Sequence, residues 1–86
     1  MTSFTTRDLY LSSVLVTLKF PLLKVDIQME GQHQNAVGYF TFEKTEDLKH
    51  IESRYLHNDL LVEPRNYVAI MRNLKDQVTN IASAPR

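Results

Sequence analysis

Residues 22–42 read LLKVDIQMEGQHQNAVGYFTF, and this stretch contains the clearest secondary-structure pattern in the chain. In its first nine residues apolar and polar side chains alternate, which is the period of a strand with one buried face. A polar turn follows over residues 31–35, and β-branched and aromatic residues resume from Ala36 to Phe42. The stretch therefore predicts a β-hairpin with a loop of medium length. The residues that the first strand would bury are Leu23, Val25, Ile27 and Met29.

The hairpin needs further partners, because an isolated two-stranded ribbon is only marginally stable in water. Gly38 shares the expected core face with Phe40 and Phe42, and its missing side chain would let a helix approach closely. We therefore expect helices on this face. The free edge of the ribbon offers a pairing site for a second copy, which would give a four-stranded sheet across a homodimer.

The segment before the hairpin predicts a helix from about Thr6 to Lys19, with Thr5 as its N-cap. Its apolar residues fall on two opposite faces. One face consists of Tyr10, Leu11, Val14, Leu15 and Leu18, and the other of Leu9, Val16 and Phe20. A surface helix needs only one such face, so we expect the second to be covered, either within the chain or by a partner. Leu9, Val16 and Phe20 are therefore the candidate partner-binding residues.

Two more helices are predicted after the hairpin. Thr45 is the N-cap of the first, which runs to Tyr55 or Leu56, and Pro64 starts the second, which runs to about Asn80. Their expected buried residues are Leu48, Ile51, Tyr55 and Leu56 in the first and Tyr67, Ile70, Met71, Leu74, Val78 and Ile81 in the second. The fold class is then a small α+β domain in the order helix, strand, strand, helix, helix. One β-hairpin packs on three helices within residues 1–81, and residues 82–86 form a flexible tail.

Composition excludes several classes of function. The chain has 86 residues, 10 basic against 10 acidic side chains and no cysteine, so it has room for one domain and carries neither a disulfide framework nor a cysteine nucleophile. His33, His50 and His57 lack the spacing of a metal-ligand pair, and there is no glycine-rich phosphate loop. We expect a protein without catalytic residues, metal or cofactor. No leader or apolar span is visible, so we expect a cytoplasmic location and no membrane contact.

Two surfaces remain as candidates for binding. Arg65, Arg72 and Lys75 lie on the polar side of the last helix and would form either a nucleic-acid-binding surface or a merely solvated helix face, of which we favour the second. The four tyrosines occur once in each main element. Each is expected at the margin of the core, whereas a cluster of exposed tyrosines would be a site for a protein partner.

The strings TTRDLYL at residues 5–11 and LVEPRNY at residues 61–67 carry a resemblance. Together with FTFE at residues 40–43, they resemble a family of very small bacterial and phage proteins classed only as a domain of unknown function. The likeness runs from about Phe4 to Val78. The resemblance implies a stand-alone protein of prokaryotic or viral origin, and it brings no catalytic residues. The expected cytoplasm is then that of a bacterium, or of the host if a phage or plasmid encodes the protein.

The predicted function is that of a small docking protein that binds another protein and self-associates as a homodimer. The alternative is a nucleic-acid-binding accessory protein that uses the basic face of the last helix.

Overall fold

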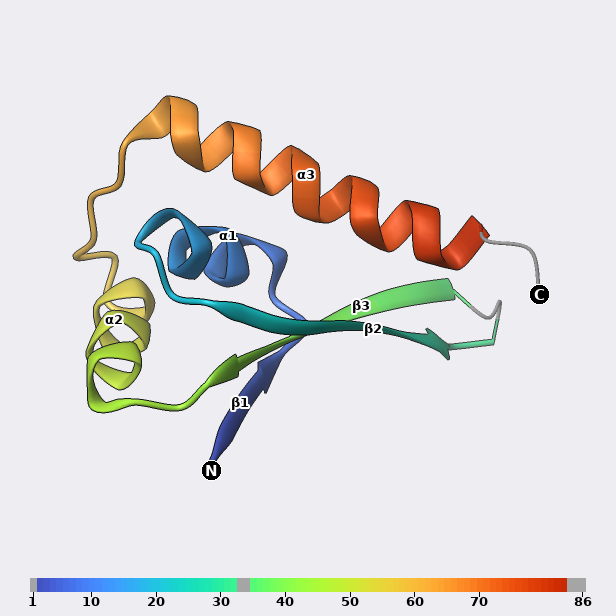
Figure 1. Ribbon diagram of the computed structural model, residues 1–86, viewed down its shortest axis with the longest axis horizontal. Coiled ribbons are helices and arrows are strands. Elements are labelled where there is room, and N and C mark those ends of the chain that lie inside the picture. Colours follow the sequence, from blue (N-terminus) through green and yellow to red (C-terminus); the bar gives the residue numbers. More distant parts are fainter. Residues whose placement is uncertain (1, 33–34, 84–86) are drawn as a thin grey trace.

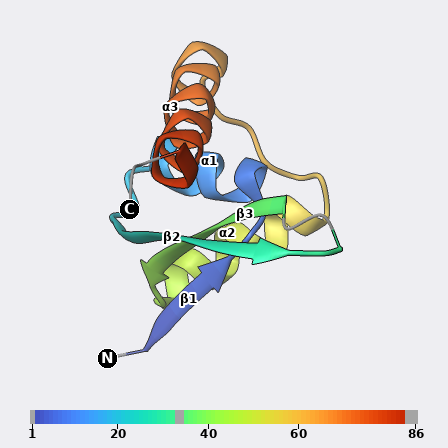
Figure 2. The same ribbon diagram turned by 90° about the vertical axis from the view of Figure 1, so that its right-hand side faces the viewer.

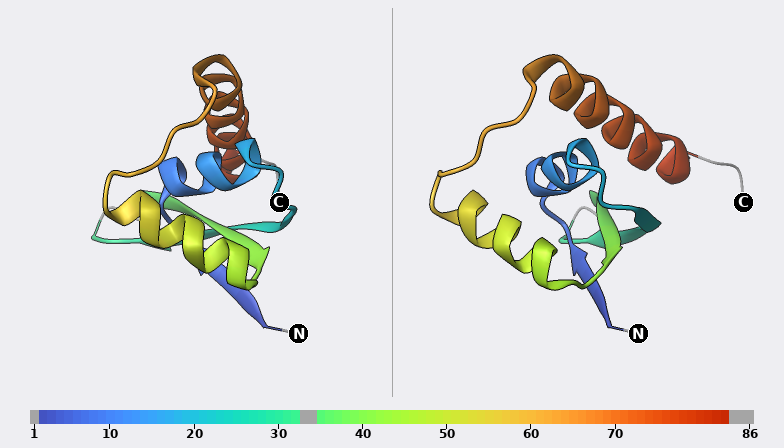
Figure 3. Two further views of the ribbon diagram at one scale, coloured as in Figure 1. Left: turned by 90° about the vertical axis from the view of Figure 1, so that its left-hand side faces the viewer. Right: turned by 60° about the vertical axis from the view of Figure 1, so that its left-hand side comes forward.

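The computed structural model describes residues 2–32 and 35–83 of the chain. The elements in this part are β1 (Ser3–Thr6), α1 (Leu9–Thr17), β2 (Leu22–Glu30), β3 (Asn35–Glu43), α2 (Glu46–Leu56) and α3 (Pro64–Ser83). The three strands form one antiparallel sheet, and α1 lies between that sheet and α3 (Figures 1 and 3). The predicted α+β class is confirmed, although a strand comes before the first helix.

The sheet has the strand order β1-β3-β2, with β3 in the middle (Figure 2). The predicted hairpin is β2 and β3, and its register places Val25 opposite Phe40 and Ile27 opposite Gly38. On the other side of β3, Phe4 lies opposite Phe42. Side chains therefore alternate between a core face, which carries the phenylalanines, and a polar outer face.

The strand β1 corrects the predicted start of the first helix. Ser3–Thr6 pair with β3, and Thr5 is not an N-cap because its hydroxyl is hydrogen-bonded to that of Thr41 at 3.0 Å. The N-cap is Asp8, whose Oδ1 accepts the backbone N–H of Tyr10 at 2.9 Å and of Leu11 at 3.1 Å. Pairing with β3 places Phe4 on the core face of the sheet, and this packing stabilises β1 as a strand. Capping residues are a local signal and do not reveal such a distant contact.

The first helix also ends earlier than predicted, at Thr17. The Phe20 N–H donates to the carbonyl of Leu15 and the Lys19 N–H to that of Val16, both at 3.0 Å. These two bonds make a Schellman motif, which requires a left-handed residue just beyond the helix. That residue is Lys19, with φ of 73°. The helix α2 ends at Leu56 with the same motif, in which Asn58 is the left-handed residue, with φ of 56°.

A β-bulge changes the predicted face of the first hairpin strand. Leu22 pairs with Phe42 and Lys24 with Thr41, so Leu23 is an extra residue in β2. A bulge moves a side chain to the other side of the sheet, and Leu23 is 54% exposed while Leu22 occupies the core face. Met29 near the hairpin turn is 48% exposed. The prediction that Leu23 and Met29 are buried is therefore wrong.

The hydrophobic core surrounds α1. It consists of Leu11, Leu15, Phe40, Phe42, Leu48 and Leu74. Ser12 and Ser13 are also fully buried, and their hydroxyls donate to the carbonyls of Asp8 and Leu9 one turn earlier. These bonds satisfy both serines, so residues 11–15 of α1 are buried on every side of the helix at little cost in unpaired polar groups, while Tyr10 in the first turn is exposed.

The predicted close approach of a helix at Gly38 is confirmed. A Cβ at this position would lie 2.5 Å from Cγ2 of Val78, so α3 packs directly on the backbone of β3.

The predicted cap of α2 is also confirmed, because Thr45 Oγ1 accepts the Leu48 N–H at 3.1 Å. Leu56 and Ile81, however, are exposed rather than buried. The helix α3 continues to Ser83, and residues 84–86 of the predicted tail lie outside the described residues.

Candidate binding surfaces

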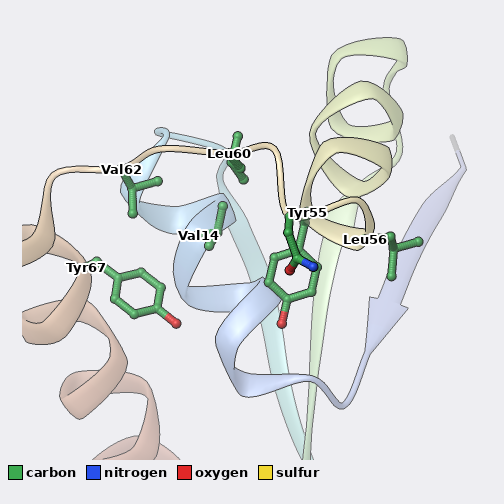
Figure 4. A pocket seen from close by; sticks show the side chains of 7 residues that line it. Val14, Tyr55, Leu56, Leu60, Val62 and Tyr67 are labelled. Carbon is green, nitrogen blue, oxygen red and sulfur yellow. The ribbon is translucent and has the colours of Figure 1, made fainter.

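A cleft of about 490 Å³ opens where α1, α2 and α3 meet the connection between α2 and α3. Its lining residues are Val14, Tyr55, Leu56, Asn58, Leu60, Val62 and Tyr67. Figure 4 shows Val14 between the rings of Tyr55 and Tyr67, whose hydroxyls point to the same side. Leu60 and Val62 come from the connection and form an apolar wall. The cleft therefore combines aromatic rings, aliphatic side chains and two hydroxyl groups, as small binding sites commonly do.

Asp8 fixes one of these tyrosines. The Tyr55 hydroxyl donates to Asp8 Oδ2 at 3.1 Å, while the other carboxylate oxygen caps α1. Burial raises the pKa of Tyr55 to about 12, and the hydrogen bond to Asp8 and the charge of Asp8 add to this effect. Burial also raises the pKa of Tyr67, with smaller effects from Tyr10 and Asp8. Both hydroxyls are therefore protonated at neutral pH, and this region disfavours additional negative charge.

The sequence did not reveal this cleft. Tyr55 and Asp8 are 47 positions apart and meet only because α2 folds back on the start of α1. The even spread of tyrosines was the available signal, and the structure brings Tyr55 and Tyr67 to the same site. Tyr39 lies elsewhere, on the outer face of the sheet, where its hydroxyl donates to Glu30.

The polar side chains of the cleft lining are those of Tyr55, Tyr67 and Asn58. None of its lining residues is a histidine, serine or acid. His50 and His57 are exposed, and His33 lies outside the described residues. Among the residues that the structure describes, no three or more His, Cys, Asp or Glu side chains gather where they would hold a metal ion.

The candidate partner-binding residues of α1 pack inward. Leu9, Val16 and Phe20 are half-buried and lie against the hydrophobic core of the same chain. The second apolar face of α1 is thus covered within the chain. The surplus of apolar surface that suggested a partner at these three residues is largely accounted for by the protein's own core.

The candidate nucleic-acid-binding residues are all exposed on α3. Arg65 and Arg72 flank a shallow hollow on its outer face, together with Val68 and Ala69. Lys75 lines a different groove, beside Arg7 and the start of β3. The three cations therefore border two separate hollows.

The outer edge of β2 is the longest open backbone edge in the described sheet. β2 has nine residues and pairs only with β3, whereas the opposite edge strand β1 has four residues. Leu23 and Met29 expose about half of their surface near its two ends. On the polar face, Lys24 pairs with Asp26 at 3.1 Å, and Arg7 pairs with Glu30 at 3.0 Å.

Comparison with known proteins gives the family but no activity. A family model described as "Domain of unknown function (DUF5659)" matches residues 1–80. The chain belongs to this family. The match confirms the resemblance of the three sequence strings to a small domain of unknown function, and its description assigns no function. No curated protein and no solved structure matches the chain. None of the helices within residues 2–32 and 35–83 is both long and apolar enough to cross a bilayer.

Proposed function

We propose that this DUF5659 protein is a non-catalytic docking module that self-associates through the outer edge of β2. The open nine-residue edge, with exposed Leu23 and Met29, is the observation that supports this proposal. An unpaired strand edge that also exposes apolar side chains is a template for pairing with another strand. Proteins usually cover such an edge or protect it with charge.

The charge pattern of β2 favours a second copy as the occupant. In an antiparallel pairing centred on Ile27, Lys24 lies opposite Glu30 of the second copy, and Val25 lies opposite Met29 of the second copy. Two-fold symmetry repeats each of these pairs. Opposite charges and apolar side chains that face each other across strands both stabilise a sheet. The bulge at Leu23 ends the regular edge, so the pairing would use residues 24–30.

Self-association would join two sheets into one of six strands, three from each copy. It would cover Met29 and leave the tyrosine cleft open, because none of the cleft residues belongs to β2. Each dimer would then present two identical clefts to a partner.

The test is the mass of the protein in solution, measured by light scattering over a range of micromolar concentrations. We expect a dimer for the unchanged chain. A monomer over the whole range would overturn the proposal.

A pair of charge reversals then tests the register. K24E and E30K each place like charges opposite one another twice in their own dimers, so each should weaken dimerisation by roughly tenfold. An equimolar mixture of the two variants restores opposite charges at both positions and should regain the affinity. A mixture as weak as the separate variants excludes the register centred on Ile27. Mixing K24E with D26K is the matched control: if the pairing is centred on Ile27, one like-charge pair remains at positions 24 and 30 and the recovery is only partial, whereas a pairing centred on Val25 restores opposite charges at both positions.

The exposed Arg65 and Arg72 favour one alternative, a nucleic-acid-binding accessory protein. The chain has no Trp and four Tyr, so it absorbs weakly and co-purifying nucleic acid would dominate its ultraviolet spectrum. Strong nucleic-acid absorbance that is lost in the double variant R65E/R72E would favour the alternative. A protein-like spectrum favours the docking module.

A further inference from the structure

We propose that the tyrosine cleft binds an arginine or lysine side chain, presented between apolar residues by an extended segment of a protein partner. This inference rests on the proposed docking function and names the chemistry of the partner.

The two aromatic rings are the first reason. Tyr55 and Tyr67 line the cleft on either side of Val14 (Figure 4). An aromatic ring attracts a cation that lies against its face, and paired rings are a common way to hold alkylammonium and guanidinium groups. Both rings come from helices that are anchored in the core, so the pair exists before a ligand arrives.

The local charge is the second reason. The seven residues that line the cleft include no Lys or Arg. Asp8 lies behind the Tyr55 hydroxyl and forms no ion pair in the described part of the chain. The connection between α2 and α3 carries Asp59 and Glu63, and the Nε of Arg54 in the last turn of α2 donates to the Asp59 carbonyl at 3.0 Å. The amides at the start of α1 offset part of the Asp8 charge, and Arg54 offsets part of the charge of the connection, so the aromatic rings carry most of the expected attraction.

The protonation of the hydroxyls agrees with this charge. The pKa of Tyr55 and that of Tyr67 are both raised, because burial and the nearby Asp8 charge disfavour a second negative group here. A phosphate or carboxylate would meet the same opposition. Burial, the largest cause, penalises a charge of either sign, so only the smaller contribution of Asp8 favours a cation over an anion here.

The apolar rim is the third reason. Leu56 borders the cleft and is 69% exposed, while Leu61 in the adjacent connection is 92% exposed. Leu60 and Val62 on either side of Leu61 turn toward the protein and are half-buried. A free-standing arginine would leave this rim in water, whereas apolar neighbours in a peptide segment would cover it.

The experiment compares two capped tripeptides, Leu-Arg-Leu and Leu-citrulline-Leu, titrated into the wild-type protein. Citrulline has nearly the shape of arginine without its charge. Binding is followed by the NMR signals of the tyrosine rings and of the amides in the α2–α3 connection. We expect the arginine peptide to bind at least about fivefold more tightly than the citrulline peptide. Equal affinity of the two peptides, or no binding of either at millimolar concentration, would overturn the inference.

Three variants locate the interaction. Tyr67→Phe keeps the ring and should bind the arginine peptide nearly as well as the wild type, whereas Tyr67→Leu should lose most of the preference over citrulline. Asp8→Asn removes the charge while keeping a residue that caps helices equally well, and it should reduce the preference. Asp76→Asn removes an exposed charge from α3, which lies outside the cleft lining, and should change nothing. An unchanged preference in Tyr67→Leu would overturn the inference.

The result can be separated from the test of self-association. Light scattering on the same samples reports the dimer, and the tripeptide titration reports the cleft. A monomer that still prefers arginine supports the cleft and excludes the dimer. A dimer that shows no preference for the arginine peptide supports self-association and excludes the proposed ligand of the cleft.

Discussion

Replacing Gly38 with alanine tests the close contact between α3 and β3. The new Cβ would lie 2.5 Å from Cγ2 and 3.3 Å from Cγ1 of Val78, and 3.5 Å from Cζ of Phe40. The first of these distances is far inside van der Waals contact. Val78 cannot simply turn away, because a β-branched side chain in a helix is held in one χ1 rotamer. The helix α3 must therefore shift from the sheet.

The expected loss of stability follows from two opposing effects. Overpacking of a tightly packed region costs about 1–3 kcal/mol. Alanine also lowers the conformational entropy of the unfolded chain, which stabilises the folded state by about 0.4–1 kcal/mol. This gain applies because Gly38 does not have a positive φ, so alanine can adopt its backbone conformation. We expect G38A to lower the free energy of unfolding by about 1–2 kcal/mol. For a chain of this length, each kcal/mol corresponds to about 4–8 °C in Tm.

The assay is urea unfolding followed by circular dichroism, at one fixed protein concentration so that any self-association affects all samples equally. The double variant G38A/V78A removes the atoms that clash. It should be more stable than the sum of the two single changes predicts, with a coupling of at least about 0.5 kcal/mol. Gly31→Ala is the control, because Gly31 has φ of +83° and no atom within 4 Å of an added Cβ. It should be destabilised by its backbone alone and show no coupling to V78A.

Two results would contradict a tight contact between Gly38 and Val78. One is a G38A protein as stable as the wild type. The other is strict additivity between G38A and V78A, which would mean that the two positions do not touch.

Two further predictions concern the ends of the helices and the tyrosine cleft. Lys19→Gly should raise the free energy of unfolding by about 0.5–1 kcal/mol in urea titrations, because Lys19 has φ of 73° and glycine adopts this conformation freely; Asn58→Gly should gain less, since asparagine tolerates it better. Tyr55→Phe should lose about 1 kcal/mol at neutral pH through the bond to Asp8. A pH series should show wild-type stability falling as the pH rises from about 10 toward 12, since tyrosine ionises first in the unfolded chain while the folded pKa of Tyr55 is about 12. The fall should be shallower in Tyr55→Phe, and an identical slope in the two proteins would contradict the assigned pKa.

Local sequence signals predicted the elements that depend on local chemistry. The hairpin, the Thr45 cap and the start of α3 at Pro64 were all visible as alternation, capping or proline placement. The close approach of a helix at Gly38 was also predicted, because a glycine on the same face as Phe40 leaves room in the core for a neighbouring helix.

The errors lie where distant residues compete with local signals. Thr5 has the chemistry of an N-cap, but pairing with Thr41 on β3 is available only in the folded chain. Either Leu22 or Leu23 fits the core face of β2, and the bulge selects the first. The tyrosine cleft was missed for the same reason, because its parts come from three helices and a connection.

The burial of α1 has a consequence for folding kinetics. Its covering elements are β3, α2 and α3, which all follow α1 in the chain, and α3 is the last of them. Native contacts that join such distant segments slow the search for the folded state. A ribosome would therefore have to release α3 before the apolar sides of α1 leave water. Until then the apolar side chains of α1 are exposed to water, unless another protein covers them. We therefore expect the domain to fold in one step after α3 has left the ribosome, and more slowly than a helical bundle of equal length.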